Sequence, residues 1–336
     1  MARDTALVTE LEYVKGGAVF QAATDIDFRC APIEEEALAA SVRAARCRAV
    51  VIGVTKYRAA LYAALAEASG SKGSLIARFG VGHDGVDKAE ARERGIAVTN
   101  TPGALDASVA ELAFWLMGAL LRNLAHEGQM RADRFGPPAG RELEGKTLGL
   151  LGFGGIGRRV ARAAHFGFGM RVIAAGRRSL GECAAASGQG EREWLAAGGL
   201  EEYTPDVARV LRTADTVSVH MPFNATTDRF INRERLALMR STALFINTSR
   251  GGLVDEDALY EALAGGAIAG AGLDVYRAEP YLPQSPEKDL RRLPNVVLTP
   301  HIGSNTAEAN ARMAAACVRK VRDFLAGRLD ASQRVC

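Results

Sequence analysis

The sequence predicts an α/β protein built from two doubly wound domains, each with a parallel β-sheet. Its 336 residues exceed the length of one ordinary domain and suggest two. In both halves, short apolar runs alternate with segments whose apolar residues repeat at helical spacing, a pattern typical of βα units. Near the middle of the chain, three glycines follow an apolar run and precede a helical segment.

The first hundred residues predict four strands and three helices. Apolar runs place the strands at 6–8, 49–54, 75–77 and 96–99, and helical spacing places the helices at 34–45, 57–68 and 88–94. The third strand leads into residues 78–87, RFGVGHDGVD, where three of six successive positions are glycine. Backbone N–H groups of such a loop can line a small anion site. A glycine-rich turn without a ligand is the interpretation that this stretch alone favours.

A long apolar helix is predicted at residues 108–124, after a break at NTPG, residues 100–103. The helix contains Glu111 and Trp115 and is otherwise apolar on nearly every side, which is typical of a buried helix. We expect it either to cross between the domains or to lie in a subunit interface. A turn-rich connector, residues 135–140, follows it, and the two features together predict a homodimer.

The stretch that organises the second half begins with the apolar run at Leu148. It turns on Gly152, Gly154 and Gly157, continues as a helix and reaches a second apolar run at 172–175. In a dinucleotide-binding turn the three glycines permit a tight turn, close approach of a pyrophosphate and close packing of helix on strand. The helix N-terminus offers unpaired N–H groups to the phosphates. The strand and helix context makes this pattern a dinucleotide site rather than a chance match.

The end of that second strand reads Gly176-Arg177-Arg178. An acidic residue that holds the ribose 2′-hydroxyl of NAD is expected roughly 20 residues after the glycine turn. Two arginines without a carboxylate favour a 2′-phosphate instead, so we predict NADP(H) as the preferred cofactor, with NAD(H) possible. The alternative is that both arginines are solvated residues at a strand end.

The remaining strands of the second half each end in polar residues. The next segment, 179–199, is rich in Gly, Ala, Ser and charge, and we expect a surface insertion without chemistry. Strands are then predicted at 216–219, 243–246, 269–273 and 296–298, and a last helix at 307–325 returns to the first domain. Ligands of open parallel sheets bind beyond the carboxyl ends of the strands. The four polar strand ends are therefore expected to face the cofactor.

Three polar residues near these strand ends can carry chemistry. Arg250 precedes a glycine turn into a helix that Asp255 can cap, and its fork of donors can grip a substrate carboxylate. His301 follows a proline at a strand end, and an imidazole is the usual proton donor near neutral pH. Glu279 can orient that imidazole. Separately the three also fit a surface arginine, a solvated acid and a structural histidine.

Over nearly its whole length the sequence resembles the D-isomer-specific 2-hydroxyacid dehydrogenase family. The resemblance begins at the loop Gly80–Gly82 and extends to the last helix. It includes five further motifs in the family's order: RGIAVTNTPG at 94–103, GFGGIG at 152–157, INTSRGGLVD at 246–255, AGLDV at 271–275 and TPHIG at 299–303. Several such motifs in one order are highly specific.

The resemblance implies a role for each of these residues. Arg250 binds the 2-oxo acid, His301 donates a proton to the ketone oxygen, and Glu279 pairs with His301. Backbone N–H groups of Val81 and Gly82 bind the substrate carboxylate. By the same resemblance the cofactor is lined by Gly155, Ile156, His220, Pro222, Thr248, Asp274 and Gly303. The glycine turn adds Gly152, Gly154 and Gly157, and the strand end adds Arg177 and Arg178.

The chain departs from the family pattern at two positions. The usual acid after the second strand is Gly176 here, and the tryptophan common after the long helix is Phe135. The first departure resembles the NADPH-linked glyoxylate and hydroxypyruvate reductases, so we expect reduction of a small 2-oxo acid to the D-2-hydroxy acid. One alternative is an NAD-dependent 3-phosphoglycerate dehydrogenase. The other is a dinucleotide-sensing protein that resembles the corepressors of this fold.

The order of strand patterns around the long apolar helix predicts that one domain is inserted into the other. A flavodoxin-like substrate domain is expected from residues 1–104 and 306–336, and a Rossmann cofactor domain from 105–305. Hinges are expected near Ala104 and Asn305.

Composition excludes several other classes of protein. The net charge of +3 is small and the basic residues are dispersed, so no nucleic-acid partner is expected. Five scattered cysteines without a C-x-x-C pair predict neither a disulfide framework nor a metal site. No apolar run is long enough to span a membrane, and the N-terminus lacks a secretory pattern, so we expect a cytoplasmic protein.

Overall fold

The computed structural model describes residues 3–124 and 139–336 and divides the chain into two compact units. Unit 1 comprises Met1–Asp106 and Ser304–Cys336, and unit 2 comprises Ala107–Gly303. Phe135 and most of its connector lie outside the described residues. None of the described helices is long and apolar enough to cross a membrane.

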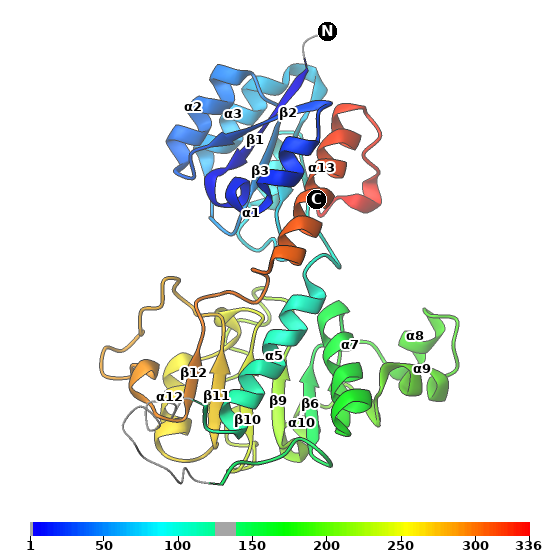
Figure 1. The fold of residues 1–336 in the computed structure, drawn as a ribbon, viewed down its shortest axis with the longest axis vertical. Helices are drawn as coiled ribbons and strands as arrows, with labels where there is room; N and C mark the ends of the chain where they lie inside the picture. The colour runs from blue at the N-terminus through cyan, green and yellow to red at the C-terminus, as the bar shows by residue number, and fades with distance from the viewer. Residues whose placement is uncertain (1–2, 125–138) are drawn as a thin grey trace. The chain divides into compact units, whose positions relative to one another are not determined.

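Unit 1 is a five-stranded parallel sheet in the order β2-β1-β3-β4-β5. This is the doubly wound order of flavodoxin-like folds, as predicted. Helices α2 and α3 pack together, and so do α1 and α13 (Figure 1). The strands are β1 (Asp4–Thr9), β2 (Ile26–Ala31), β3 (Ala49–Ile52), β4 (Ser74–Arg78) and β5 (Ile96–Thr99); the helices are α1 (Glu10–Ala22), α2 (Glu35–Ala45), α3 (Ala59–Ser69), α4 (Lys88–Glu93) and α13 (Ala307–Leu325).

Unit 2 contains a seven-stranded parallel sheet in the order β12-β11-β10-β9-β6-β7-β8. The order reverses between β6 and β9, which is the switch point where doubly wound sheets bind dinucleotides. The strands are β6 (Thr147–Leu151), β7 (Arg171–Ala175), β8 (Glu202–Thr204), β9 (Thr216–Val219), β10 (Leu244–Asn247), β11 (Gly270–Leu273) and β12 (Val296–Leu298).

The helices of unit 2 connect these strands. They are α5 (Asp106–Leu121), α7 (Gly155–Arg162), α8 (Leu180–Ala185), α9 (Glu191–Gly198), α10 (Val207–Thr213), α11 (Arg233–Leu236) and α12 (Glu256–Ala264). A π-helical turn, Ala163–Gly167, extends α7. The Asp255 carboxylate caps α12 by accepting from the Ala258 N–H at 3.1 Å, as the sequence suggests.

The segment at 179–199 is mostly exposed, as expected of a surface insertion, but it also contributes to the core. The segment contains α8 and α9, and it buries Cys183 and Trp194 in the core beside β6 and β7. Trp194 is only 2% exposed. The composition of the segment gave no sign of these core contacts, because the few large side chains that anchor it are separated by small and charged residues.

The long apolar helix is buried on one side only within one chain. One face of α5 packs in the unit 2 core through Ala113, Leu116 and Met117. Glu111 is exposed, and Trp115 is 73% exposed. The described residues therefore leave the side of α5 that carries Glu111 and Trp115 uncovered.

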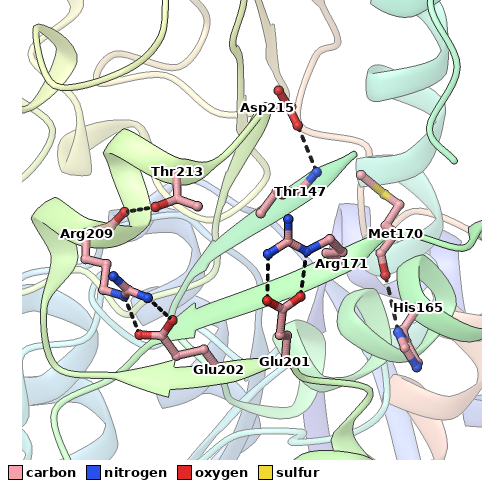
Figure 2. Close-up of polar contacts among 9 residues, drawn as sticks. All are labelled: Thr147, His165, Met170, Arg171, Glu201, Glu202, Arg209, Thr213 and Asp215. Atoms are coloured by element: carbon pink, nitrogen blue, oxygen red, sulfur yellow. Dashed lines mark hydrogen bonds and ion pairs between the residues drawn. The ribbon is translucent and has the colours of Figure 1, made fainter. Parts of the chain in front are cut away.

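Ion pairs and local hydrogen bonds hold the edge of the unit 2 sheet together. Figure 2 shows Arg171 and Glu201 in a two-bond pair at 2.6 Å, and Arg209 and Glu202 in another at 2.6 and 2.8 Å. The Asp215 carboxylate accepts from the Thr147 N–H at 2.9 Å in the same view. Each exposed pair stabilises the fold only modestly, because water screens the charges. Their bidentate geometry nevertheless fixes where β8 lies.

Candidate active site

The glycine turn after β6 has the backbone geometry that a dinucleotide site needs. Gly152 has φ +101°, and a Cβ there would lie 2.5 Å from the His220 carbonyl oxygen. A Cβ at Gly157 would lie 2.5 Å from the Gly152 carbonyl oxygen. A Cβ at Gly154 would meet nothing within 4 Å, so this glycine leaves an open backbone surface. Gly152 and Gly157 thus permit the tight packing of the turn, and Gly154 permits a phosphate to approach the backbone. This arrangement fits a pyrophosphate at the start of α7.

Gly155 and Ile156 begin α7. The two arginines predicted to contact the cofactor follow the end of β7, after Gly176. Arg177 and Arg178 are both exposed. The N–H of Gly176 donates to the Thr204 carbonyl at 3.2 Å, so the chain is still paired with β8 at this point. The strand end therefore presents two cationic side chains and no carboxylate.

His220 and Pro222 lie just beyond the end of β9, and Thr248 lies just beyond β10. The Ser218 hydroxyl lies 2.9 Å from Nε2 of His220, and burial lowers the pKa of His220 to about 4. The imidazole is therefore neutral at physiological pH. The buried hydroxyl of Thr248 has no hydrogen-bond partner among the described residues. An unpaired buried hydroxyl at a strand end is expected where a ligand completes the site.

Asp274, at the end of β11, holds the loop that carries His301. One carboxylate oxygen accepts from the Thr299 hydroxyl at 2.6 Å and the Ile302 N–H at 2.8 Å, and the other accepts from the Gly303 N–H at 2.8 Å. Burial raises the pKa of Asp274 against the lowering effect of these hydrogen bonds. The carboxylate thus fixes the backbone on the C-terminal side of His301.

The structure brings His301 and Glu279 together. The Nδ1 atom of His301 lies 2.6 Å from Oε2 of Glu279, and Oε1 of Glu279 accepts from the Tyr276 N–H at 3.0 Å. Burial tends to raise the pKa of Glu279, but the hydrogen bond and charge of His301, the Tyr276 N–H and the charge of Arg250 together lower it. Glu279 is therefore a carboxylate at neutral pH that orients the imidazole through its Nδ1 atom.

Arg250 stands beside this pair at the start of the turn that follows β10. It is half-buried, and one guanidinium nitrogen donates to the Ser249 carbonyl at 2.7 Å. The Asn247 amide donates to the Arg250 carbonyl at 2.9 Å, which fixes the turn. Arg250, Glu279 and His301 thus all belong to unit 2 and follow neighbouring strands of its sheet.

Val81 and Gly82 lie in unit 1, in the loop after β4. The Asn100 amide donates to the Val81 carbonyl at 2.7 Å, and the Thr101 N–H donates to the Gly80 carbonyl at 3.0 Å. Asn100 was not singled out in the sequence, although it stands in the NTPG break that follows β5. Its amide holds the glycine loop through the Val81 carbonyl.

The D-isomer-specific 2-hydroxyacid dehydrogenase NAD-binding domain model matches residues 114–303. The hydroxypyruvate reductase of Thermotoga maritima is 40% identical over 260 residues, which cover 75% of this chain and 78% of that protein.

Two solved structures are similar over nearly the whole chain. The NADPH-dependent glyoxylate/hydroxypyruvate reductase of Sinorhizobium meliloti, in complex with NADP and malonate, is 29% identical with a TM-score of 0.80, covering 100% of this chain and 97% of that one. The D-lactate dehydrogenase of Aquifex aeolicus, complexed with NAD and lactic acid, is 28% identical with a TM-score of 0.81, covering 98% of each chain. The chain belongs to the D-isomer-specific 2-hydroxyacid dehydrogenase family and is an NAD(P)-dependent dehydrogenase.

Proposed function

We propose that the protein reduces a small 2-oxo acid, such as glyoxylate or hydroxypyruvate, to the D-2-hydroxy acid with NADPH. The observation that carries this proposal is the hydrogen-bonded pair of His301 and Glu279, with Arg250 close enough for its charge to act on Glu279. A proton donor, its orienting carboxylate and a carboxylate-binding cation are the three groups that this reaction requires. The hydroxypyruvate and glyoxylate reductases among the relatives support the same substrate class.

Each residue has a defined part in the proposed reaction. The glycine turn would hold the pyrophosphate of the dinucleotide, and its reduced nicotinamide would supply the hydride. His301 donates a proton from Nε2 to the ketone oxygen, while Glu279 holds Nδ1 and stabilises the positive imidazolium. Arg250 binds the substrate carboxylate through its guanidinium. The guanidinium balances the charge of that carboxylate, and its hydrogen bonds hold the substrate so that the ketone carbon is in place for reduction.

The proposed preference for NADPH depends on Gly176, Arg177 and Arg178. Gly176 carries no carboxylate to repel a 2′-phosphate, and the two arginines are exposed at the strand end. A hydrogen bond to a charged group contributes roughly 1.5–3 kcal/mol, and each 1.4 kcal/mol is about tenfold in affinity. One well-placed arginine therefore favours NADPH over NADH by roughly ten- to a hundredfold. The similar S. meliloti enzyme binds NADP, which supports this choice.

The proposed function is tested by steady-state kinetics on a panel of 2-oxo acids with NADPH and with NADH. The panel contains glyoxylate, hydroxypyruvate, pyruvate, 3-phosphohydroxypyruvate and a bulky aryl analogue. We expect the highest kcat/KM for glyoxylate or hydroxypyruvate with NADPH. A preference for 3-phosphohydroxypyruvate with NADH would support a phosphoglycerate dehydrogenase instead, and no turnover of any substrate would support a dinucleotide sensor.

We also propose that the protein is a homodimer that uses α5 at its interface. Trp115 projects from an otherwise apolar helix and is 73% exposed within one chain. Tryptophan is enriched among the residues that contribute most to protein interfaces. A second copy that covers this face would bury the side chain.

A further inference from the structure

Tyr203 of β8 occupies the space above Gly176, where an NAD-binding enzyme of this fold places an acid. A Cβ atom at position 176 would lie 1.9 Å from the Tyr203 hydroxyl oxygen and 2.8 Å from the adjoining ring carbon. Real Cβ atoms essentially never approach other atoms so closely. Any side chain at 176 therefore requires Tyr203 to move.

The tyrosine ring is held too firmly to move easily. It packs edge-on against Trp194, with ring centroids 5.2 Å apart, and against Phe153, with centroids 6.0 Å apart. Its backbone is paired with Ala174 in the parallel register of β7 and β8. The Arg171–Glu201 and Arg209–Glu202 pairs fasten the start of β8 and the helix that follows it (Figure 2).

The Tyr203 hydroxyl keeps its own proton available. Among the described residues its hydrogen-bond partner is Cys183, whose Sγ atom lies 3.6 Å from the hydroxyl oxygen. Sulfur is a weak acceptor, so the tyrosine proton can be donated to a stronger one. Burial, followed by the Cys183 contact, raises the pKa of Tyr203 to about 12, while the charges of Arg178 and Arg158 act in the opposite direction. The phenol is therefore a neutral hydrogen-bond donor at physiological pH.

The charges of two arginines act on this hydroxyl. The charge of Arg178 acts on it from the end of β7, and that of Arg158 acts on it from the first turn of α7. The Arg158 guanidinium lies over the rings of Phe153 and Trp194, 5.0 and 5.2 Å from their centroids. The rings that fix Tyr203 thus also hold a cation beside it.

We propose that Tyr203 is a specificity-determining residue for the adenosine end of the cofactor. Its ring excludes an acidic side chain from position 176, and its hydroxyl donates to the 2′-phosphate of NADPH between Arg158 and Arg178. The exclusion of an acid follows from the geometry of this chain alone, whereas the donor role rests on the proposed preference for NADPH.

The donor role is tested by calorimetric titration with 2′,5′-ADP and with 5′-ADP, which differ only in the 2′-phosphate. Tyr203→Phe keeps the ring and removes the hydroxyl, so we expect about tenfold weaker binding of 2′,5′-ADP and unchanged binding of 5′-ADP. Tyr13→Phe, in unit 1, is the control and leaves both affinities unchanged. An unchanged ratio of affinities in Tyr203→Phe would overturn the donor role.

The steric role is tested with Gly176→Asp, Tyr203→Val and the double variant. Valine suits a strand and removes the ring that meets position 176. Alone, Gly176→Asp is expected to lower Tm without tighter NADH binding by fluorescence titration. The double variant is expected to bind NADH at least tenfold more tightly than either single variant. Tight NADH binding and an unchanged Tm in Gly176→Asp would overturn the steric role.

The two experiments separate this inference from the proposed function. Equal affinities of the wild type for 2′,5′-ADP and 5′-ADP would overturn both the NADPH preference and the donor role. The outcome with Gly176→Asp and the double variant would still decide the steric role, because NADH carries no 2′-phosphate.

Discussion

His301 stands in a backbone conformation that few side chains adopt, with φ +53°. Its N–H donates to the Thr299 carbonyl at 3.1 Å, and its ring is oriented by Glu279. A non-glycine residue with positive φ persists only where its surroundings determine it, and such positions concentrate at functional sites. The conformation presents the imidazole at the carboxyl end of β12, which is where the proposed reaction needs a proton donor.

Replacing His301 by alanine is expected to lower kcat for 2-oxo acid reduction on the order of 10²- to 10⁴-fold. NADPH binding should change little, because the proposed cofactor contacts belong to other residues. Stopped-flow and fluorescence titrations measure the two quantities separately. His165→Ala is a matched control, since His165 contacts the Met170 carbonyl at 3.2 Å away from the strand ends (Figure 2). An equal loss in both variants would remove His301 from the chemistry.

Glu279→Gln is expected to change the pH profile of the reaction. His301 and the other neighbours of Glu279 lower the pKa of this carboxyl in spite of its burial, so the group is ionised at neutral pH. Its negative charge favours the protonated imidazole that reduction requires. Glutamine keeps the shape and removes the charge, so activity should fade at a lower pH than in the wild type. Profiles of kcat against pH test this, and superimposable alkaline limbs would contradict it.

His220 is expected to make stability depend on pH. Burial lowers the pKa of His220 to about 4, below its unfolded value of 6.5. Between these values the unfolded chain binds a proton that the native chain does not, so stability falls as pH decreases from 6.5 to 4. The contribution is at most about 3 kcal/mol, because the side chain is only partly enclosed. Urea unfolding of wild type and His220→Asn at pH 7 and pH 5 should show a smaller pH effect in the variant.

At the residue scale, motif residues were predictable and their spatial neighbours were not. The sequence alone suggests that Gly176→Asp with Arg177→Ala would invert the cofactor preference. The structure adds that an aspartate would collide with Tyr203. This contact depends on the register of β7 and β8, and a three-residue edge strand such as β8 has too few residues to show a periodic pattern.

At the scale of elements, strands with continuous apolar runs were predicted closely. The predictions for β5, β9, β12 and α13 coincide with the observed bounds. Helix α1 was missed because its buried positions are Glu12, Gly16 and Phe20, which form no apolar stripe. Strand β2 was missed because charged residues, Asp27 and Arg29, interrupt its alternation. The glycine turn was predictable because its backbone demands glycine, whatever the neighbouring sequence.

The loop between β12 and α13 is expected to depend on Asp274. Asparagine keeps the shape of the side chain, but its amide nitrogen donates and cannot accept hydrogen bonds. At least one of the bonds donated by Thr299, Ile302 and Gly303 is therefore lost. A buried N–H left unpaired costs about 1–3 kcal/mol. Asp274→Asn should lower the free energy of unfolding by this amount and reduce kcat through the displaced His301. Thr299→Val, which removes one donor only, should have the smaller effect on kcat; the reverse order would argue against this role.

At the scale of the molecule, each sheet has the strand order of a doubly wound fold. The alternation of strands and helices predicted this class, because parallel strands need a crossover segment between them. Unit 1 is formed by two separate segments of the chain, and unit 2 is continuous. The exposed face of α5 was not predictable, because an apolar pattern does not distinguish a core of one chain from an interface between two.

Trp115→Lys is expected to convert the proposed homodimer into a monomer. The side chain is 73% exposed, so its replacement should alter the fold of the single chain little. An interface tryptophan commonly contributes 2 kcal/mol or more, so dimer dissociation should rise by about thirtyfold or more. Light scattering across a concentration series measures this, with circular dichroism to confirm the fold. Leu282→Lys replaces another exposed apolar residue, 68% exposed and outside α5, and should leave the dimer intact. A variant that dimerises as the wild type does would place the interface away from Trp115. A wild type that is monomeric at every concentration would exclude the homodimer.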